Sequence, residues 1–183
     1  MRRLILMRHA KAAKQGPTGK DRDRPLEERG RGDARDIGAY LRRPALLPDL
    51  ALVSTAVRTR ETWDCLSADW PAVAVEFHDS LYGADPGELL AAVRATRVRD
   101  PHRLLMIAHN PGLHEFALAL IANAPGTAGA TLADHLPTAG VVVIDFAVKG
   151  WNEVTFRRGR LEAFVTPRHL KDAPGATHPE KHG

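Results

Sequence analysis

Four residues of this sequence have side chains that could bind and transfer a phosphoryl group: Arg8, His9, Arg58 and His109. An arginine guanidinium offers a planar fork of N–H donors that matches phosphate oxygens. A neutral histidine can donate a hydrogen bond to such an oxygen, or attack phosphorus through its unprotonated ring nitrogen. Either histidine alone would more often be a packing residue bonded to the backbone. The set favours phosphate chemistry because the sequence predicts that all four residues lie at one edge of the fold.

Each of these residues lies at or shortly after the end of an apolar run. The runs are short and continuous, which is typical of strands buried on both faces. They are Leu4–Met7, Leu50–Val53 and Leu104–Ala108, and Val73–Phe77 is expected to form a further strand. In open α/β sheets, ligands bind beyond the carboxyl ends of the strands. The sequence therefore predicts a phosphate site at that edge of a sheet.

Amphipathic stretches between the apolar runs predict helices. Apolar or small residues recur at three- and four-residue spacing from Glu28 to Leu41, and a second helix is expected from about Ala56 to Leu66. Asp85-Pro86 and Asn110-Pro111 each place a capping residue directly before a proline. Both pairs are therefore expected to open helices.

Strands that alternate with helices predict a three-layer α/β/α sandwich with a mainly parallel sheet. Two closing strands, Val141–Ala147 and Glu153–Phe164, are joined around Gly150 and predict an antiparallel addition at one edge. Residues 122–139 are expected to form a loop. We expect a single catalytic domain over residues 1–166 and a polar C-terminal tail, 167–183, that frays.

Composition limits the remaining possibilities. A chain of 183 residues with 44% hydrophobic and 26% charged residues is expected to form one ordinary globular core. The net charge of +4 is mild and the basic residues are spread along the chain, which argues against a nucleic-acid partner. The single cysteine, Cys65, excludes an internal disulfide and a cysteine-based metal cluster. Because the first apolar run is too short for a signal peptide or a membrane span, we expect a soluble, cytoplasmic protein without a membrane partner.

Three segments resemble the motifs of the histidine phosphatase superfamily, whose fold is phosphoglycerate mutase-like. Leu6–Ala10 resembles its Arg-His-Gly motif, with Ala10 in place of the usual glycine. Ser54–Thr62 is similar to its second motif, Ser-x-x-x-Arg-[Ala/Thr]-x-x-Thr, and Ile107–Pro111 resembles its third, a small residue and a histidine with a nearby proline. An Arg-His pair alone is common by chance, whereas the three motifs in this order are specific. The resemblance extends from Arg2 to about Leu120.

Within the superfamily, the chain looks most similar to the short phosphohistidine phosphatases of the SixA type. Four further segments carry this resemblance: Arg8–Lys11, Asp23–Leu26 with the following Arg29-Gly30, Leu81–Ala84 before a helix, and Thr166-Pro167 after the last strand. It implies a metal-independent phosphatase without a cofactor.

The resemblance also implies a role for each residue of the first set. His9 would be the nucleophile that takes the phosphoryl group, giving a phosphohistidine intermediate. Arg8, Arg58 and His109 would hold the phosphoryl oxygens and stabilise charge in the transition state.

Three other residues in these segments are expected to act outside the phosphoryl transfer itself or at its edge. Arg24 matches an arginine that lines the pocket in the short members, although a surface loop arginine is an equally good interpretation. Asn110 is expected to cap a helix. Ser54 is expected to shape the turn after its strand, because no base with nucleophile spacing accompanies it.

One departure from the family pattern bears on the substrate. The mutase-like and general phosphatase branches place a glutamate that acts as general acid in the segment that reads His78–Asp85 here, and this chain has none near Leu81. Asp79 is the nearest substitute, and whether it transfers a proton stays open. Loss of the acid should slow the hydrolysis of alcohol phosphoesters by about 10²–10⁴-fold. An imidazole leaving from phosphohistidine needs less help, because its phosphorus–nitrogen bond is weak once the ring is protonated.

Chain length points to the same substrate class. Only fifty residues separate Arg58 from His109, which leaves little for a lid over the site. An open site suits phosphohistidine on a protein. The alternatives are a small phosphorylated substrate for a phosphomonoesterase of the same superfamily, a mutase, or a non-catalytic module that binds phosphate or a phosphoprotein. The oligomeric state stays open.

Overall fold

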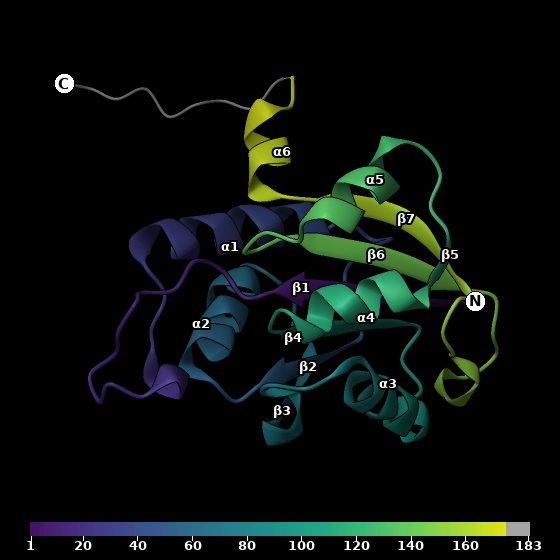
Figure 1. The fold of residues 1–183 in the computed structure, drawn as a ribbon, viewed down its shortest axis with the longest axis horizontal. Coiled ribbons are helices and arrows are strands. Elements are labelled where there is room, and N and C mark those ends of the chain that lie inside the picture. Colours follow the sequence, from purple (N-terminus) through teal and green to yellow (C-terminus); the bar gives the residue numbers. More distant parts are fainter. Residues whose placement is uncertain (175–183) are drawn as a thin grey trace.

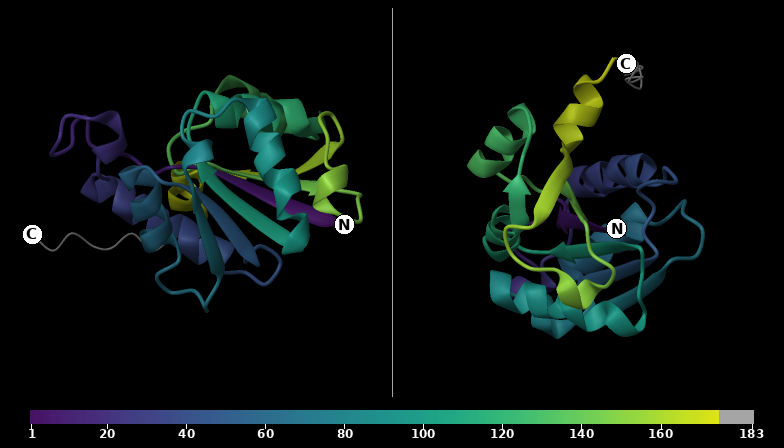
Figure 2. Two further views of the ribbon diagram at one scale, coloured as in Figure 1. Left: turned by 90° about the horizontal axis from the view of Figure 1, so that it is seen from below. Right: turned by 90° about the vertical axis from the view of Figure 1, so that its right-hand side faces the viewer.

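The computed structural model describes residues 1–174, which form a sheet between two layers of helices (Figure 1). Helices α1 (Glu28–Leu41) and α2 (Val57–Leu66) cover one face of the sheet. Helices α3 (Pro86–Ala95), α4 (Gly112–Leu120) and α5 (Thr127–Asp134) cover the other, as Figure 2 shows with the sheet seen edge-on. The predicted three-layer α/β/α architecture is confirmed.

Seven strands form the sheet within the described residues, in the order β3-β2-β4-β1-β6-β7-β5. Their bounds are β1 Arg2–Arg8, β2 Leu50–Ser54, β3 Ala74–His78, β4 Arg103–Ala108, β5 Ile121–Asn123, β6 Val141–Phe146 and β7 Gly159–Val165. The first four strands of the chain pair in parallel, whereas β6 runs antiparallel to both of its neighbours, β1 and β7. Because β2, β4 and β1 are adjacent, the three predicted motif-bearing strands end side by side.

Strand β1 lies in the middle of the hydrophobic core. Its side chains alternate between the two faces, so that Leu4 and Leu6 pack under α3 and α4 while Ile5 and Met7 pack under α1 and α2. All four are fully buried. A continuous apolar run is what a strand covered on both faces requires.

Two predictions about the second half of the chain are wrong. The expected loop at 122–139 contains α5, which packs through the fully buried Leu132. The last strand begins at Gly159 rather than Glu153, and residues 151–153 form a short 3-10 turn. The cause is Trp151, which is fully buried and donates its indole N–H to the carbonyl of Pro101 at 2.6 Å. This anchor holds the segment away from the sheet.

The segment after Thr166 also differs from its prediction. Instead of fraying, Pro167–Asp172 forms helix α6, and the Thr166 side chain caps it by accepting the His169 N–H at 3.2 Å. Lys171 then joins the helix to α1 through Asp33, with 2.8 Å between the charged atoms. The rest of the predicted tail, residues 175–183, lies outside the described residues. Within residues 1–174, no helix combines the length and the apolar character needed to cross a membrane.

Candidate active site

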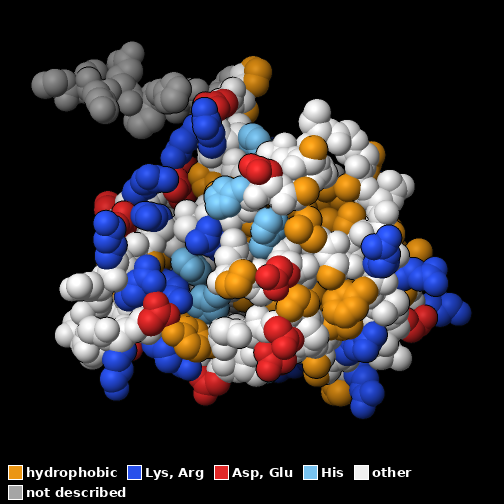
Figure 3. All heavy atoms as spheres, in the orientation of Figure 1, with side chains coloured by type: hydrophobic (Ala, Val, Ile, Leu, Met, Phe, Trp, Pro, Cys, Tyr) orange, Lys and Arg blue, Asp and Glu red, His pale blue; other side chains and the backbone are white. Residues whose placement is uncertain are grey.

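The carboxyl ends of β1, β4 and β2 bring the four predicted phosphate-binding residues together. Arg8 pairs with Ala108 across the β1–β4 register, so His9 and His109 follow neighbouring strand ends, with their ring centroids 5.4 Å apart. Arg58 is the second residue of α2, which follows β2. Figure 3 shows histidine side chains reaching one face of the molecule, with Lys and Arg side chains gathered beside them.

His9 is held in one tautomer by the backbone. Its Nδ1 lies 2.8 Å from the carbonyl oxygen of Ala10, which can only accept, so Nδ1 carries the proton and donates. In the neutral ring, Nε2 is then the unprotonated nitrogen. Burial lowers the pKa of His9 to about 4, and the nearby Arg58 and Arg8 guanidinium groups add to the effect. His9 is therefore neutral and can act as a nucleophile at neutral pH.

Two contacts fix the backbone after His9. The Ala10 N–H donates to Thr62 Oγ1 at 3.0 Å, which ties the end of β1 to α2. Gly30 packs so closely that a Cβ atom would lie 2.2 Å from the carbonyl oxygen of Lys11. Ala10 replaces the family's glycine without backbone strain, because its φ is not positive.

His109 is fixed by Ser54, a contact that the sequence did not reveal. His109 Nε2 lies 2.7 Å from Ser54 Oγ, and Nδ1 is buried without a partner. Burial, followed by the proximity of His9 and Arg58, lowers the pKa of His109 to about 3. The interpretation of Ser54 as a turn-shaping residue alone is therefore incomplete.

Asn110 does not cap a helix, contrary to the prediction. Helix α4 begins at Gly112, and the preceding Pro111 supplies no side-chain cap. Asn110 Nδ2 instead donates to the carbonyl of Leu136 at 2.9 Å, and Arg8 Nη1 donates to the same oxygen at 3.1 Å. The corresponding prediction for Asp85 is confirmed, since its side chain accepts the N–H of Glu88 in a capping box.

Asp21 is the main residue of the site that sequence reasoning missed. Its backbone oxygen and its Oδ2 accept from the two terminal nitrogens of Arg58 at 2.8 and 3.0 Å. Arg24 donates to Oδ1 at 2.8 Å, and the Tyr82 hydroxyl donates to Oδ2 at 2.5 Å. These donors, Tyr82 first and then the arginines, hold the pKa of the Asp21 carboxyl far below its usual range. Arg24 thus adjoins the site through Asp21.

Asp79 is also held in its ionised form. It lies at the surface, where it accepts hydrogen bonds from the Thr55 hydroxyl and from Arg22, the latter at 2.8 Å. Those donors lower the pKa of the Asp79 carboxyl. A carboxylate that is already ionised at neutral pH is a poor proton donor.

The strand ends leave polar groups free for a ligand. In the part of the chain that the structure describes, four buried side-chain polar atoms have no hydrogen-bond partner, and all four belong to this site: Arg8 Nε, Arg58 Nε, His109 Nδ1 and Asn110 Oδ1. Buried polar atoms are normally paired. A ligand with several acceptor oxygens, such as a phosphoryl group, would satisfy the donors among them.

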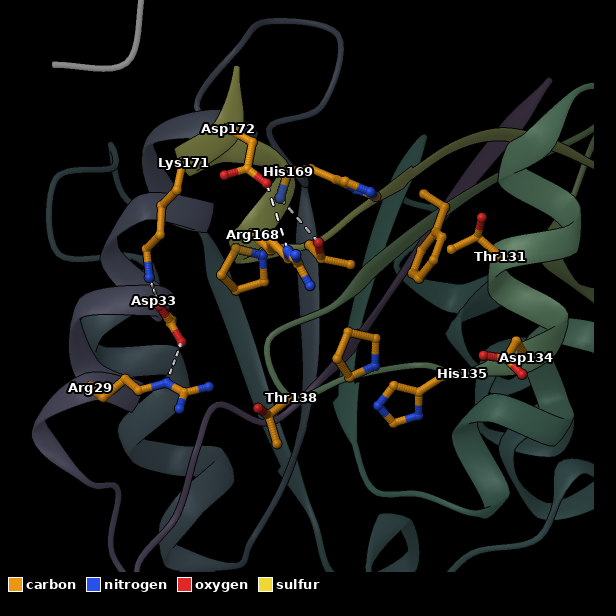
Figure 4. Close-up of a pocket in the computed structure, with 14 residues that line it drawn as sticks. Arg29, Asp33, Thr131, Asp134, His135, Thr138, Arg168, His169, Lys171 and Asp172 are labelled. Carbon is orange, nitrogen blue, oxygen red and sulfur yellow. Dashed lines mark hydrogen bonds and ion pairs between the residues drawn. The ribbon is translucent and has the colours of Figure 1, made fainter. Parts of the chain in front are cut away.

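A groove of about 740 Å³ lies between α1, the segment after α5 and α6, and none of the residues just named lines it. Figure 4 shows Asp33 paired with Lys171 and Arg29 on one side, and His135 and Thr138 across from them. Leu136, whose carbonyl binds Arg8, lies between those last two residues in the chain. Among residues 1–174, no three His, Cys, Asp or Glu side chains are grouped so that they could hold a metal ion.

Comparisons with known proteins identify relatives of this chain. Residues 4–112 match the model of the histidine phosphatase superfamily, branch 1. An uncharacterized protein of Mycobacterium tuberculosis is 36% identical over 88% of this chain and 100% of its own length. The solved structure of the proposed phosphohistidine phosphatase SixA of Nakamurella multipartitia is 28% identical, with a TM-score of 0.79, over 91% of this chain and 96% of that one. Its counterpart from Agrobacterium tumefaciens is 29% identical, with a TM-score of 0.75, over 91% and 98%.

Proposed function

The chain belongs to the histidine phosphatase superfamily, branch 1, and on that premise we propose that it is a phosphatase that removes the phosphoryl group from phosphohistidine on a protein. The proposal rests above all on the state of His9. This residue combines a buried position, a proton held on Nδ1 and a depressed pKa, which together leave Nε2 free to attack phosphorus.

The reaction would proceed in two displacements. His9 Nε2 attacks phosphorus, the phosphorus–nitrogen bond of the substrate breaks, and the substrate imidazole leaves with a proton that it already carries. Water then attacks phosphorus on His9, which releases inorganic phosphate and a proton and restores the free ring. Arg8, Arg58 and His109 would hold the phosphoryl oxygens through both steps, since their unpartnered N–H groups lie at the same strand ends.

The carboxylates around the site favour a phosphoramidate over an alcohol phosphoester. An alkoxide leaving group needs a proton, and both nearby carboxyl groups, Asp21 and Asp79, have lowered pKa values. Tyr82 is occupied by its hydrogen bond to Asp21, which raises the pKa of its hydroxyl. An imidazole leaving group that is protonated in the substrate does not need such an acid.

The surroundings of the site favour a protein substrate. We propose that the groove lined by His135 and Pro137, the chain neighbours of Leu136, holds residues that flank a phosphorylated side chain. The two solved structures at 28% and 29% identity are both described as proposed phosphohistidine phosphatases. We extend the proposal to a cytoplasmic location, which fractionation of cells that express a tagged copy would check.

A substrate panel tests this function. We expect kcat/KM to be highest for a phosphohistidine protein, lower for para-nitrophenyl phosphate and lowest for sugar phosphates. A preference for sugar phosphates would support the small-molecule phosphomonoesterase, and phosphate binding without turnover of any substrate would support a binding module.

The nucleophile is tested by trapping its adduct. Rapid quench with labelled substrate should give an acid-labile, base-stable phosphoryl adduct in the wild type and none in His9→Ala. The matched control is His78→Ala, which removes a surface histidine paired with Glu76 and should form the adduct normally. An adduct at wild-type level in His9→Ala would place the nucleophile elsewhere.

A further inference from the structure

The hydrogen bond between Ser54 and His109 is buried and short. Ser54 is fully buried at the end of β2, His109 is 8% exposed after β4, and 2.7 Å separates Ser54 Oγ from His109 Nε2. Either atom could be the donor, because a hydroxyl can donate or accept and the proton of a neutral imidazole can lie on either nitrogen. The surroundings of the hydroxyl decide between the two.

The hydroxyl of Ser54 has a single acceptor. Its other neighbour is the N–H of Ala56, a donor 3.5 Å from Oγ, and the described residues offer the hydroxyl proton no acceptor besides His109 Nε2. If Nε2 carried the ring proton, Ser54 would accept from both sides and its own proton would be buried without a partner. A buried hydroxyl proton without an acceptor destabilises the folded protein. The hydroxyl therefore donates to an unprotonated Nε2.

The position of the ring proton matters because the neutral imidazole of His109 carries only one. The positive charges of Arg58 and Arg22 act on His109, with the His9 ring beside it and the Asp21 carboxylate as the opposing charge. The buried, mainly positive surroundings keep the ring neutral at neutral pH. With Nε2 unprotonated, the single proton lies on Nδ1, the nitrogen that has no partner in the protein.

We propose that Ser54 is a positioning residue that sets the tautomer of His109, so that the neutral ring presents an Nδ1–H donor to a phosphoryl oxygen. In the other tautomer, Nδ1, the nitrogen without a partner in the protein, would carry a lone pair and would repel that oxygen. The role in catalysis rests on the proposed phosphatase activity, whereas the tautomer itself does not.

The tautomer can be measured without any turnover. In protein labelled with ¹⁵N-histidine, long-range ¹H–¹⁵N correlation at pH 7 should show His109 with a pyrrole-like Nδ1 and a pyridine-like Nε2, its signals identified by their loss in His109→Gln. Ser54→Ala should move the proton toward Nε2. A wild-type His109 with a pyrrole-like Nε2, or a spectrum that Ser54→Ala leaves unchanged, would overturn the proposal.

Kinetics provide a second readout. Ser54→Ala should lower kcat for para-nitrophenyl phosphate about tenfold with little change in KM, less than the 10²–10³-fold loss typical of removing a donor outright. Thr59→Val is the matched control. The buried Thr59 hydroxyl bonds the carbonyls of Ser54 and Ala56 in the same turn without touching His109, so the variant should keep the wild-type kcat and His109 tautomer.

The outcomes distinguish the role of Ser54 in setting the tautomer from a purely structural role and from the proposed phosphatase activity. Equal kcat losses in Ser54→Ala and Thr59→Val would mean that Ser54 acts only through the shape of the turn. If Ser54→Ala fails to fold, the wild-type spectrum alone decides the tautomer. A wild type without phosphatase activity but with the Nδ1–H tautomer would contradict the proposed function and leave the role of Ser54 in setting the tautomer standing.

Discussion

Acidification should leave His9 neutral far below the pH at which an ordinary histidine becomes charged. Burial and two nearby guanidinium groups lower the pKa of His9 to about 4, from about 6.5 for an ordinary histidine. A difference of about 2.5 pH units corresponds to about 3 kcal/mol that opposes protonation in the folded protein. At pH 5, about 90% of His9 is then neutral, against about 3% for a histidine with an unperturbed pKa. The supply of nucleophile at pH 5 therefore differs by about 30-fold between the two cases.

Two measurements check this value. The acid limb of kcat/KM for para-nitrophenyl phosphate should lie below pH 6.5, once the ionisation of the substrate phosphate, near pH 6, is taken into account. NMR titration of His9 in the free protein avoids that correction. Because burial is the largest cause of the shift, Arg58→Met should raise the pKa of His9 only in part and leave it below 6.5. Saturating phosphate should raise it, since an anion reverses the local field.

The same shift predicts how stability depends on pH. A histidine with a depressed pKa in the folded state takes up protons more readily when the chain unfolds. The contribution of His9 to the free energy of unfolding is therefore fully present above pH 6.5 and is lost as the pH falls toward about 4. Between pH 7 and 5, the free energy of unfolding should fall by about 2 kcal/mol less in His9→Ala than in the wild type. Urea denaturation measures the difference. A His9 that titrates at or above 6.5, with equal losses in the two proteins, would refute the electrostatic reasoning.

Three further predictions concern the phosphate site. Arg8→Ala and Arg58→Ala should each lose at least about a hundredfold in kcat/KM, with lysine restoring only part because it cannot bond two oxygens in one plane; near-normal rates in both alanine variants would mean that the oxygens are held elsewhere. Asp21→Asn should make inorganic phosphate a stronger competitive inhibitor, because the Asp21 carboxylate occupies the Nη2 nitrogen of Arg58; an unchanged or weaker inhibition constant would contradict this competition. Activity should persist in excess EDTA, and its loss on chelation with recovery on adding a divalent cation would count against a histidine nucleophile.

The sequence by itself determined the four parallel strands β1 to β4 and the residues at their carboxyl edge. Continuous apolar runs such as Leu4–Met7 allow a strand only where both faces are covered, so strand positions and layers could be predicted from local pattern. His109 follows such a run directly and His9 and Arg58 lie shortly after one, and their meeting at one edge follows from parallel pairing. The cap of α3 at Asp85 is equally local, because donor and acceptor are three residues apart.

Only the tertiary structure decided what those residues bind. Arg58 binds Asp21, which lies 37 positions away in the chain. His109 binds Ser54, 55 positions away, and Asn110 binds the carbonyl of Leu136, 26 positions away. A hydrogen bond over such a separation leaves no periodic or capping pattern in the sequence, so the sequence predicts only a cap at Asn110 and a turn residue at Ser54. The helix of residues 167–172 could not be predicted from local pattern either. It is held partly by the contact of Lys171 with Asp33, which lies 138 positions earlier in the chain. Local pattern determines where a side chain emerges, whereas the packing of distant segments determines its hydrogen-bond partner and its charge.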